Sequence, residues 1–205
     1  MNHFLPPASR KRLLHVGCGT ARPERLPVCF RSPEWQEIRL DIDPGVQPDV
    51  VGTITDMSAI ETGSMDAIWS SHNLEHVNAF EVPTALAEFR RVLKPSGYAL
   101  ISLPDLRAVA QRIAQDMLTE PLYESAAGPI TPLDVVFGHQ AAIARGQVHM
   151  SHRTGFTART LGQALVEAGF VEVRVHEGTR WDLWAIGTMP ETPEQVFEEL
   201  APVLA

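Results

Sequence analysis

Leu13-Leu14-His15-Val16-Gly17-Cys18-Gly19 is the stretch from which the fold can be inferred. Residues 12–16 are expected to form a strand, and the two glycines that follow let the backbone turn sharply and approach a ligand closely. Asp41 comes ~20 residues later, at the end of a second predicted strand, where a carboxylate can bind both ribose hydroxyls of a nucleoside. The pattern predicts a nucleoside-binding loop, although the glycines alone would also fit a structural turn.

Beyond this stretch, strand-like and helix-like segments alternate, which predicts a parallel sheet covered by helices. Further strands are predicted at 49–54, 65–70, 98–103, 171–175 and 183–188, and helices at 82–93, 106–118 and 157–168. The fold class is therefore α/β, with a Rossmann-like, mostly parallel seven-stranded sheet and helices on both faces. We expect one domain over residues 1–205, ending in a C-terminal helix at 192–204 that Thr192 caps.

Residues 119–153 interrupt this alternation and contain three prolines and three glycines, with at most a short helix around 132–144. A long irregular insertion in a compact domain is usually a lid or a binding loop. Apolar side chains such as Val135 and Phe137 argue against a disordered surface loop. We therefore expect a lid at 119–153.

The composition is that of a soluble globular protein, with 44% hydrophobic and 20% charged residues. Acidic residues outnumber basic ones, 25 to 17, and the formal charge of −8 argues against general nucleic-acid binding. Cys18 and Cys29 are not spaced as a metal or redox pair, and reduced thiols are expected. No signal peptide and no apolar run of ~20 residues is found, so we expect a cytoplasmic protein without a membrane span.

The segment between the first two strands bears on the kind of nucleoside. Pro23, Pro27 and Pro33 interrupt it, and Ala21 stands where a dinucleotide fingerprint has its third glycine. A dinucleotide needs a helix N-terminus for its pyrophosphate, so a cofactor without phosphate fits better. The net negative charge also tolerates a cationic sulfonium.

Five motifs follow one another along the chain: Leu-His-Val-Gly-Cys-Gly-Thr at 14–20, Leu-Asp-Ile-Asp-Pro at 40–44, Gly-Ser-Met-Asp-Ala-Ile-Trp-Ser-Ser-His-Asn-Leu-Glu-His-Val at 63–77, Glu-Phe-Arg-Arg-Val-Leu-Lys-Pro-Ser-Gly-Tyr at 88–98 and Leu-Val-Glu-Ala-Gly-Phe at 165–170. In this order they resemble the class I S-adenosylmethionine-dependent methyltransferases, in the branch called type 11. The resemblance covers most of residues 12–103 and 155–188. It implies S-adenosyl-L-methionine as the cofactor and methyl transfer as the activity.

The resemblance also implies roles for single residues. Gly17, Cys18 and Gly19 would line the methionyl part of the cofactor, Asp41 would hold the ribose, and Ile42 would lie beside the adenine.

Later motifs would complete the cofactor site. Asp56 is the carboxylate available for the adenine amino group, and Ser70, Ser71 and His72 would present their backbone to the sulfonium. His15 stands where the family usually has the acid that pairs with the cofactor's amino group.

Two alternatives remain open. The departures at His15 and Thr53, where the family often has acids, would also fit a protein that binds the cofactor without catalysis. His72-Asn73-Leu74-Glu75-His76 matches the His-x-x-Glu-His pattern of zinc hydrolases, in which a helix presents both imidazoles to one metal ion. The order of the five motifs favours the methyltransferase.

The acceptor is expected to be a small molecule, which the sequence does not identify. Methyl transfer is an in-line displacement that needs the nucleophile ~3 Å from the methyl group, and a nearby base helps when the nucleophile carries a proton. His139, His149, His152 and Arg153 of the insertion are candidates for acceptor binding or proton removal, or else polar lid residues. No metal is expected, since an ion shared by His149 and His152 has no evident further ligands.

Overall fold

A computed structural model describes residues 10–20, 22, 24, 26–125 and 127–204. Ala21 and Pro23, used above against a dinucleotide, lie outside these residues. The sheet has seven strands in the order β3-β2-β1-β4-β5-β9-β8, of which only β9 runs antiparallel to its neighbours. The strands are β1 Lys11–Val16, β2 Trp35–Asp41, β3 Val50–Val51, β4 Met65–Ser71, β5 Leu93–Pro104, β8 Val173–Glu177 and β9 Asp182–Thr188. The predicted α/β fold with a mostly parallel seven-stranded sheet is confirmed.

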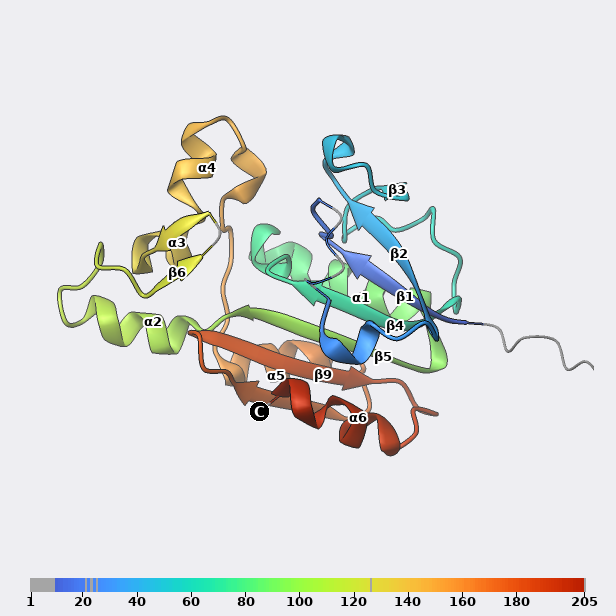
Figure 1. The fold of residues 1–205 in the computed structure, drawn as a ribbon. Coiled ribbons are helices and arrows are strands. Elements are labelled where there is room, and N and C mark those ends of the chain that lie inside the picture. Colours follow the sequence, from blue (N-terminus) through green and yellow to red (C-terminus); the bar gives the residue numbers. More distant parts are fainter. Residues whose placement is uncertain (1–9, 21, 23, 25, 126, 205) are drawn as a thin grey trace, which may run out of the picture.

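Helices cover both faces of this sheet (Figure 1). Alternate residues of β1 point to opposite faces, so Leu14 packs in the core on one side and Leu13 in the core on the other. The first core is covered by α1 Val82–Val92 and α5 Ala158–Glu167, and the second by α6 Gln195–Leu204 and the 3-10 helix Val28–Phe30.

Helix α1 ends at Val92 and the strand begins directly at Leu93, rather than at Tyr98 as the sequence suggested. The loop before β4 explains this difference, because the amide of Gly63 donates to the Arg91 carbonyl at 2.9 Å and that of Ser64 to the Val92 carbonyl at 2.9 Å. These carbonyls belong to the last turn of α1 and have no helical partner of their own. The chain can therefore leave the helix and pair Leu93 with Met65.

The start of the last helix was wrongly predicted. The helix α6 begins at Gln195, and the Thr192 hydroxyl donates to the Gly97 carbonyl at 2.7 Å instead of capping it. This contact fastens the chain to β5 over a long sequence distance, which a local capping pattern cannot reveal.

The insertion forms a compact lid beyond the carboxyl ends of β1, β4 and β5 (Figure 1). Its elements are the hairpin β6 Tyr123–Ser125 and β7 Gly128–Ile130, and the helices α3 Pro132–Phe137 and α4 Gln140–Ala144, while α2 Leu106–Ile113 leads into it. The single short helix predicted at 132–144 is broken at Gly138, where φ is 92°. A Cβ atom at Gly138 would collide with the Met150 carbonyl, so glycine lets the middle of the lid approach its C-terminal end.

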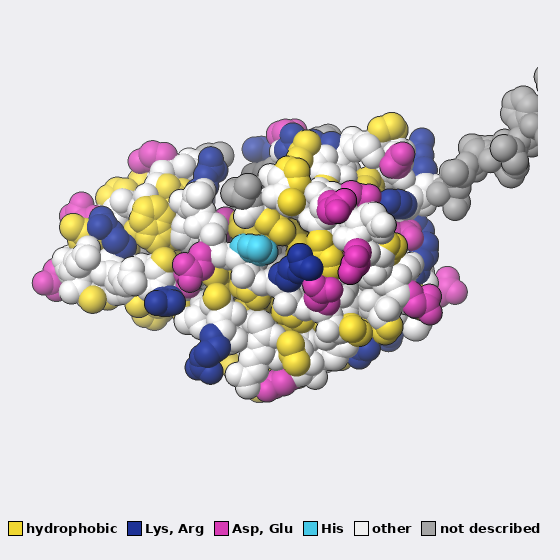
Figure 2. Space-filling view, turned by 90° about the horizontal axis from the view of Figure 1, so that it is seen from below, with side chains coloured by type: hydrophobic (Ala, Val, Ile, Leu, Met, Phe, Trp, Pro, Cys, Tyr) yellow, Lys and Arg dark blue, Asp and Glu magenta, His cyan; other side chains and the backbone are white. Residues whose placement is uncertain are grey.

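Charged side chains of both signs are mixed on the face shown in Figure 2, which is seen from below Figure 1. Nucleic-acid binders usually gather their basic residues in a patch or stripe, and the described part of this face shows no continuous one. Among the described residues, no helix is both long and apolar enough to cross a membrane.

Candidate functional site

The glycine loop after β1 has the backbone conformation that its residues suggested. Gly17 and Gly19 have φ values of 62° and 58°, in the left-handed region that only glycine adopts at low cost. A Cβ atom at Gly17 would lie 2.7 Å from Cγ of Asn73, so the loop packs tightly against the segment after β4. Asn73 Nδ2 is buried and has no hydrogen-bond partner among the described residues. The amide therefore adds a free donor beside the loop, a feature that the sequence analysis missed.

Asp41 lies at the tip of β2, next to this loop. Its carboxylate accepts hydrogen bonds from the Gly19 amide at 2.8 Å and the Asp43 amide at 2.9 Å, one on each oxygen. Ile42 beside it is 55% exposed and offers an apolar surface. Each carboxylate oxygen retains a lone pair, so Asp41 can hold the loop in place and still accept from a ribose hydroxyl.

Two other residues predicted to contact the cofactor are His15 and Cys18. His15 already has a partner within the protein, and Cys18 has an unreactive thiol. His15 is buried, and its Nδ1 lies 2.7 Å from Oε1 of Glu37 in the neighbouring strand. Burial raises the pKa of the Cys18 thiol to about 11, so this side chain stays neutral and acts as a small apolar group.

Asp56 lies in the turn after β3. The Ser58 side chain, and after it the Ser58 amide that donates to the Asp56 carboxylate at 3.1 Å, hold the pKa of Asp56 below its usual value. The open depression that it lines continues over Glu88 and Arg91 of α1 and includes no residue of the glycine loop. The pairing of Asp56 with adenine stays a prediction.

The end of β4 lies level with the end of β1, because the parallel register pairs Val16 with Ser70. The Ser70 hydroxyl is fully buried and has no hydrogen-bond partner within the described part of the chain. Ser71 ends the strand, and His72 follows with a φ of 47°, its amide donating to the Ser102 carbonyl at 2.8 Å. The turn at His72 directs the chain from the sheet toward the lid.

A pocket of ≈ 230 Å³ opens between this turn and the lid. It brings His72 and His76, which follow β4, together with His139 and His152 of the insertion. The remaining walls come from the β5 end, the lid and the β8–β9 turn, and are Pro104, Tyr123, Ser125, Ala127, Ile130, Asp134, Val135, Met150, Arg180 and Trp181.

Of the four predicted acceptor-site residues, the structure places His139 and His152 in this pocket and leaves the other two outside it. His149 is exposed on the 3-10 helix Val148–Met150, and Arg153 is also exposed. The backbone amide of Arg153 donates to the Glu75 carbonyl at 2.9 Å. This hydrogen bond holds the segment that leaves the lid against the turn after β4.

Glu75 is the most buried charged side chain next to the pocket, with 1% of its surface exposed. Burial alone would raise its pKa, but His72, whose Nδ1 lies 3.3 Å from Oε1, and the nearby His76 and His152 outweigh this and lower the pKa. Burial lowers the pKa of His152, despite the opposing effect of Glu75. At neutral pH the cluster therefore holds an anionic carboxylate beside a neutral His152 imidazole.

The segment from His72 to His76 does not have the geometry of a helical zinc-hydrolase motif. Leu74–His76 is one 3-10 turn, and His72 before it is left-handed. Both imidazoles would have to project from one face of an α-helix. The hydrolase alternative is thus not supported by the local backbone.

Comparison with known proteins agrees with this fold and loop arrangement. Residues 14–101 match the type 11 family model described as a methyltransferase domain. Together with the fold, this match supports a class I S-adenosylmethionine-dependent methyltransferase domain of the type 11 branch. No curated protein sequence matches the chain.

Solved structures share the fold at low sequence identity. A SAM-dependent methyltransferase from Archaeoglobus fulgidus is 16% identical with a TM-score of 0.55, covering 87% of this chain and 86% of that one. A SAM-dependent methyltransferase from Methanosarcina mazei is 15% identical with a TM-score of 0.56, covering 88% of this chain and 93% of that one. A SAM-dependent methyltransferase from Aquifex aeolicus is 15% identical with a TM-score of 0.53, covering 88% of this chain and 84% of that one.

Proposed function

We propose that the chain is an active enzyme that transfers the methyl group of S-adenosylmethionine to a small molecule bound under the lid. The observation that carries this proposal is the position of the ≈ 230 Å³ pocket, which begins at His72 where β4 ends. In α/β sheets of this kind, ligands bind outside the carboxyl ends of the strands. A cofactor on the glycine loop would then present its methyl group toward the pocket.

The volume of the pocket limits the size of the acceptor. Pockets for drug-sized ligands span about 300–1,000 Å³, so one of ≈ 230 Å³ fits a small metabolite. Its wall is partly apolar, with Tyr123, Ile130 and Trp181, and partly polar, with imidazoles. An acceptor with an apolar body and one hydroxyl or amine would match both parts.

His139 is the side chain that we assign to proton removal. It lies in the pocket wall just before α4 and makes no capping hydrogen bond with that helix, so its ring is free to face a ligand. Methyl transfer itself needs mainly alignment of the nucleophile with the breaking bond. A neutral histidine would take the proton of a hydroxyl or ammonium acceptor.

A second candidate function is cofactor binding without turnover. It is favoured by one observation, the pairing of His15 with Glu37, because this imidazole is then not available to the cofactor's amino group. Purified protein incubated with labelled S-adenosylmethionine and a metabolite extract distinguishes the two functions. A labelled small product is expected. Cofactor binding without any labelled product would support the second function instead.

Asp41→Ala is expected to weaken binding of S-adenosylmethionine by ~1–3 kcal/mol, because charge-assisted hydrogen bonds to the ribose and to the loop are lost. Isothermal titration measures this change. Asp43→Ala is the matched control, since the Asp43 side chain accepts only from the Gly45 amide of its own turn. Equal losses in both variants, or unchanged affinity in Asp41→Ala with the fold intact, would contradict the ribose assignment.

A further inference from the structure

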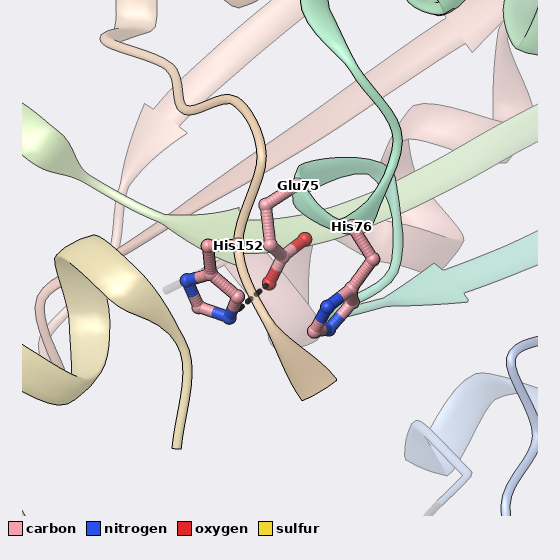
Figure 3. Close-up of side chains that lie close together, drawn as sticks. All are labelled: Glu75, His76 and His152. Carbon is pink, nitrogen blue, oxygen red and sulfur yellow. Dashed lines mark ion pairs between the residues drawn. The ribbon is translucent and has the colours of Figure 1, made fainter. Parts of the chain in front are cut away.

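Glu75, His76 and His152 form a cluster (Figure 3), and its two histidines line the pocket. One potential ligand atom from each lies within 4.8 Å of the other two. Glu75 and His76 come from the 3-10 turn after β4, whereas His152 comes from the loop segment in which the lid returns to the domain. The lid therefore supplies one member of the cluster and the turn after β4 the other two.

Backbone carbonyls hold both imidazoles in one orientation. Nδ1 of His76 lies 3.1 Å from the Ser151 carbonyl, and Nδ1 of His152 lies 2.7 Å from the Val135 carbonyl. A carbonyl oxygen only accepts, so Nδ1 carries the proton in each ring and Nε2 has the free lone pair. Histidines that bind metal ions are usually fixed in this way by a second hydrogen bond.

The carboxylate between the two rings has one close ion-pair partner, the half-exposed His72. Glu75 is 1% exposed, and neither of its oxygens accepts a hydrogen bond from the described residues. Nε2 of His152 lies 4.0 Å from Glu75 Oε1, so two lone-pair-bearing atoms face each other across a short gap. His72 Nδ1 lies 3.3 Å from the same oxygen, but its side chain is 49% exposed and lies at the edge of the cluster. Buried charges are normally paired or bound to a metal ion.

We propose that Glu75, His76 and His152 bind one divalent transition-metal ion of the zinc type. Two imidazoles and a carboxylate are a ligand set that zinc uses in catalytic sites, where the fourth position stays open. Since His76 and His152 line the pocket, the open position would face it and take water or an oxygen or nitrogen atom of a ligand. This site goes beyond the proposed methyl transfer, and metal binding can be tested without it.

The ligand atoms need only a small movement to reach bonding geometry. Ligands of a tetrahedral zinc ion lie about 2.0–2.2 Å from the metal and therefore about 3.3–3.6 Å from one another. The present separations of 4.0 Å and up to 4.8 Å are larger by about an ångström. His152 lies in a loop segment, and a small shift of the lid toward the sheet would close this difference.

The test is a titration of the whole chain, freed of metal with a chelator, with zinc chloride in the absence of S-adenosylmethionine. One zinc ion per chain is expected to bind, with a rise in the melting temperature. His152→Ala should lower the zinc affinity roughly 100-fold, at least as much as the loss of an outer-sphere partner usually costs. Glu75→Gln is also expected to lower the zinc affinity. Because this substitution changes a buried group, circular dichroism first checks that the variant is folded.

His149→Ala and His139→Ala are the matched controls. His149 lies three residues before His152 but is exposed, and His139 lies in the same pocket but outside the cluster. Both should bind zinc as the unsubstituted chain does. The site is refuted if the unsubstituted chain binds no stoichiometric zinc, or if His152→Ala binds it equally well. An equal loss in either control also refutes this ligand set. None of these outcomes depends on turnover, so the methyltransferase proposal stands or fails separately.

Discussion

His139→Ala should lower kcat by about 10²–10⁴-fold when the acceptor must lose a proton, the range that a positioned general base contributes. The affinity for S-adenosylmethionine should not change, because His139 lies in the lid and no residue of the glycine loop lines its pocket. Steady-state kinetics with the identified acceptor and titration of the cofactor measure the two effects separately. A structural role for His139 would instead change the melting temperature and both constants together.

His149→Ala is the control for this substitution, since it removes the same side chain from the same lid but at an exposed position outside the pocket. Its turnover is expected to equal that of the unsubstituted enzyme. If the two variants lose the same activity, or if His139→Ala stays fully active, the base must be sought elsewhere in the pocket.

Gly17→Ala is expected to raise the Kd for S-adenosylmethionine by at least ~10-fold. A left-handed conformation costs a residue with a Cβ about 1–2 kcal/mol, and at Gly17 the added atom would also lie 2.7 Å from Cγ of Asn73. The loop must change shape to relieve both effects, and the binding surface changes with it. Isothermal titration of the folded variant provides the measurement.

Gly63→Ala is the control for Gly17→Ala, because it introduces the same backbone strain without a steric contact. Gly63 has nearly the same φ, 65°, but a Cβ atom there would meet nothing within 4 Å. This control should lose about 1–2 kcal/mol of stability without any change in cofactor affinity. If both variants bind the cofactor normally, the glycine loop is not its binding site.

Several elements could be predicted because their signals are local. The apolar run of β1 and the helical spacing of α1 arise from neighbouring residues, and the structure shows both elements within a few residues of the predicted bounds. The cap of α5 is a similar case, since Thr157 accepts from the Thr160 amide three residues away.

Other features were missed because their causes are distant in the sequence. Thr192 looked like a helix cap, but Gly97 lies close to it in the folded chain and accepts its hydrogen bond. The lid was expected as mostly irregular chain, and it contains a hairpin and two helices that short Pro- and Gly-rich segments do not reveal.

The sequence by itself determined the sheet, the left-handed glycine loop beside a carboxylate and the existence of an insertion, since hydrophobic periodicity and turn chemistry act between near neighbours. Only the tertiary structure decided which side chains share a site. His152 reaches Glu75 and His76 because the lid folds back on the β4 end, and Asn73 reaches Gly17 because β1 and β4 are adjacent in the sheet. Contacts of this kind follow from the strand order and the packing of the lid, which no local pattern encodes.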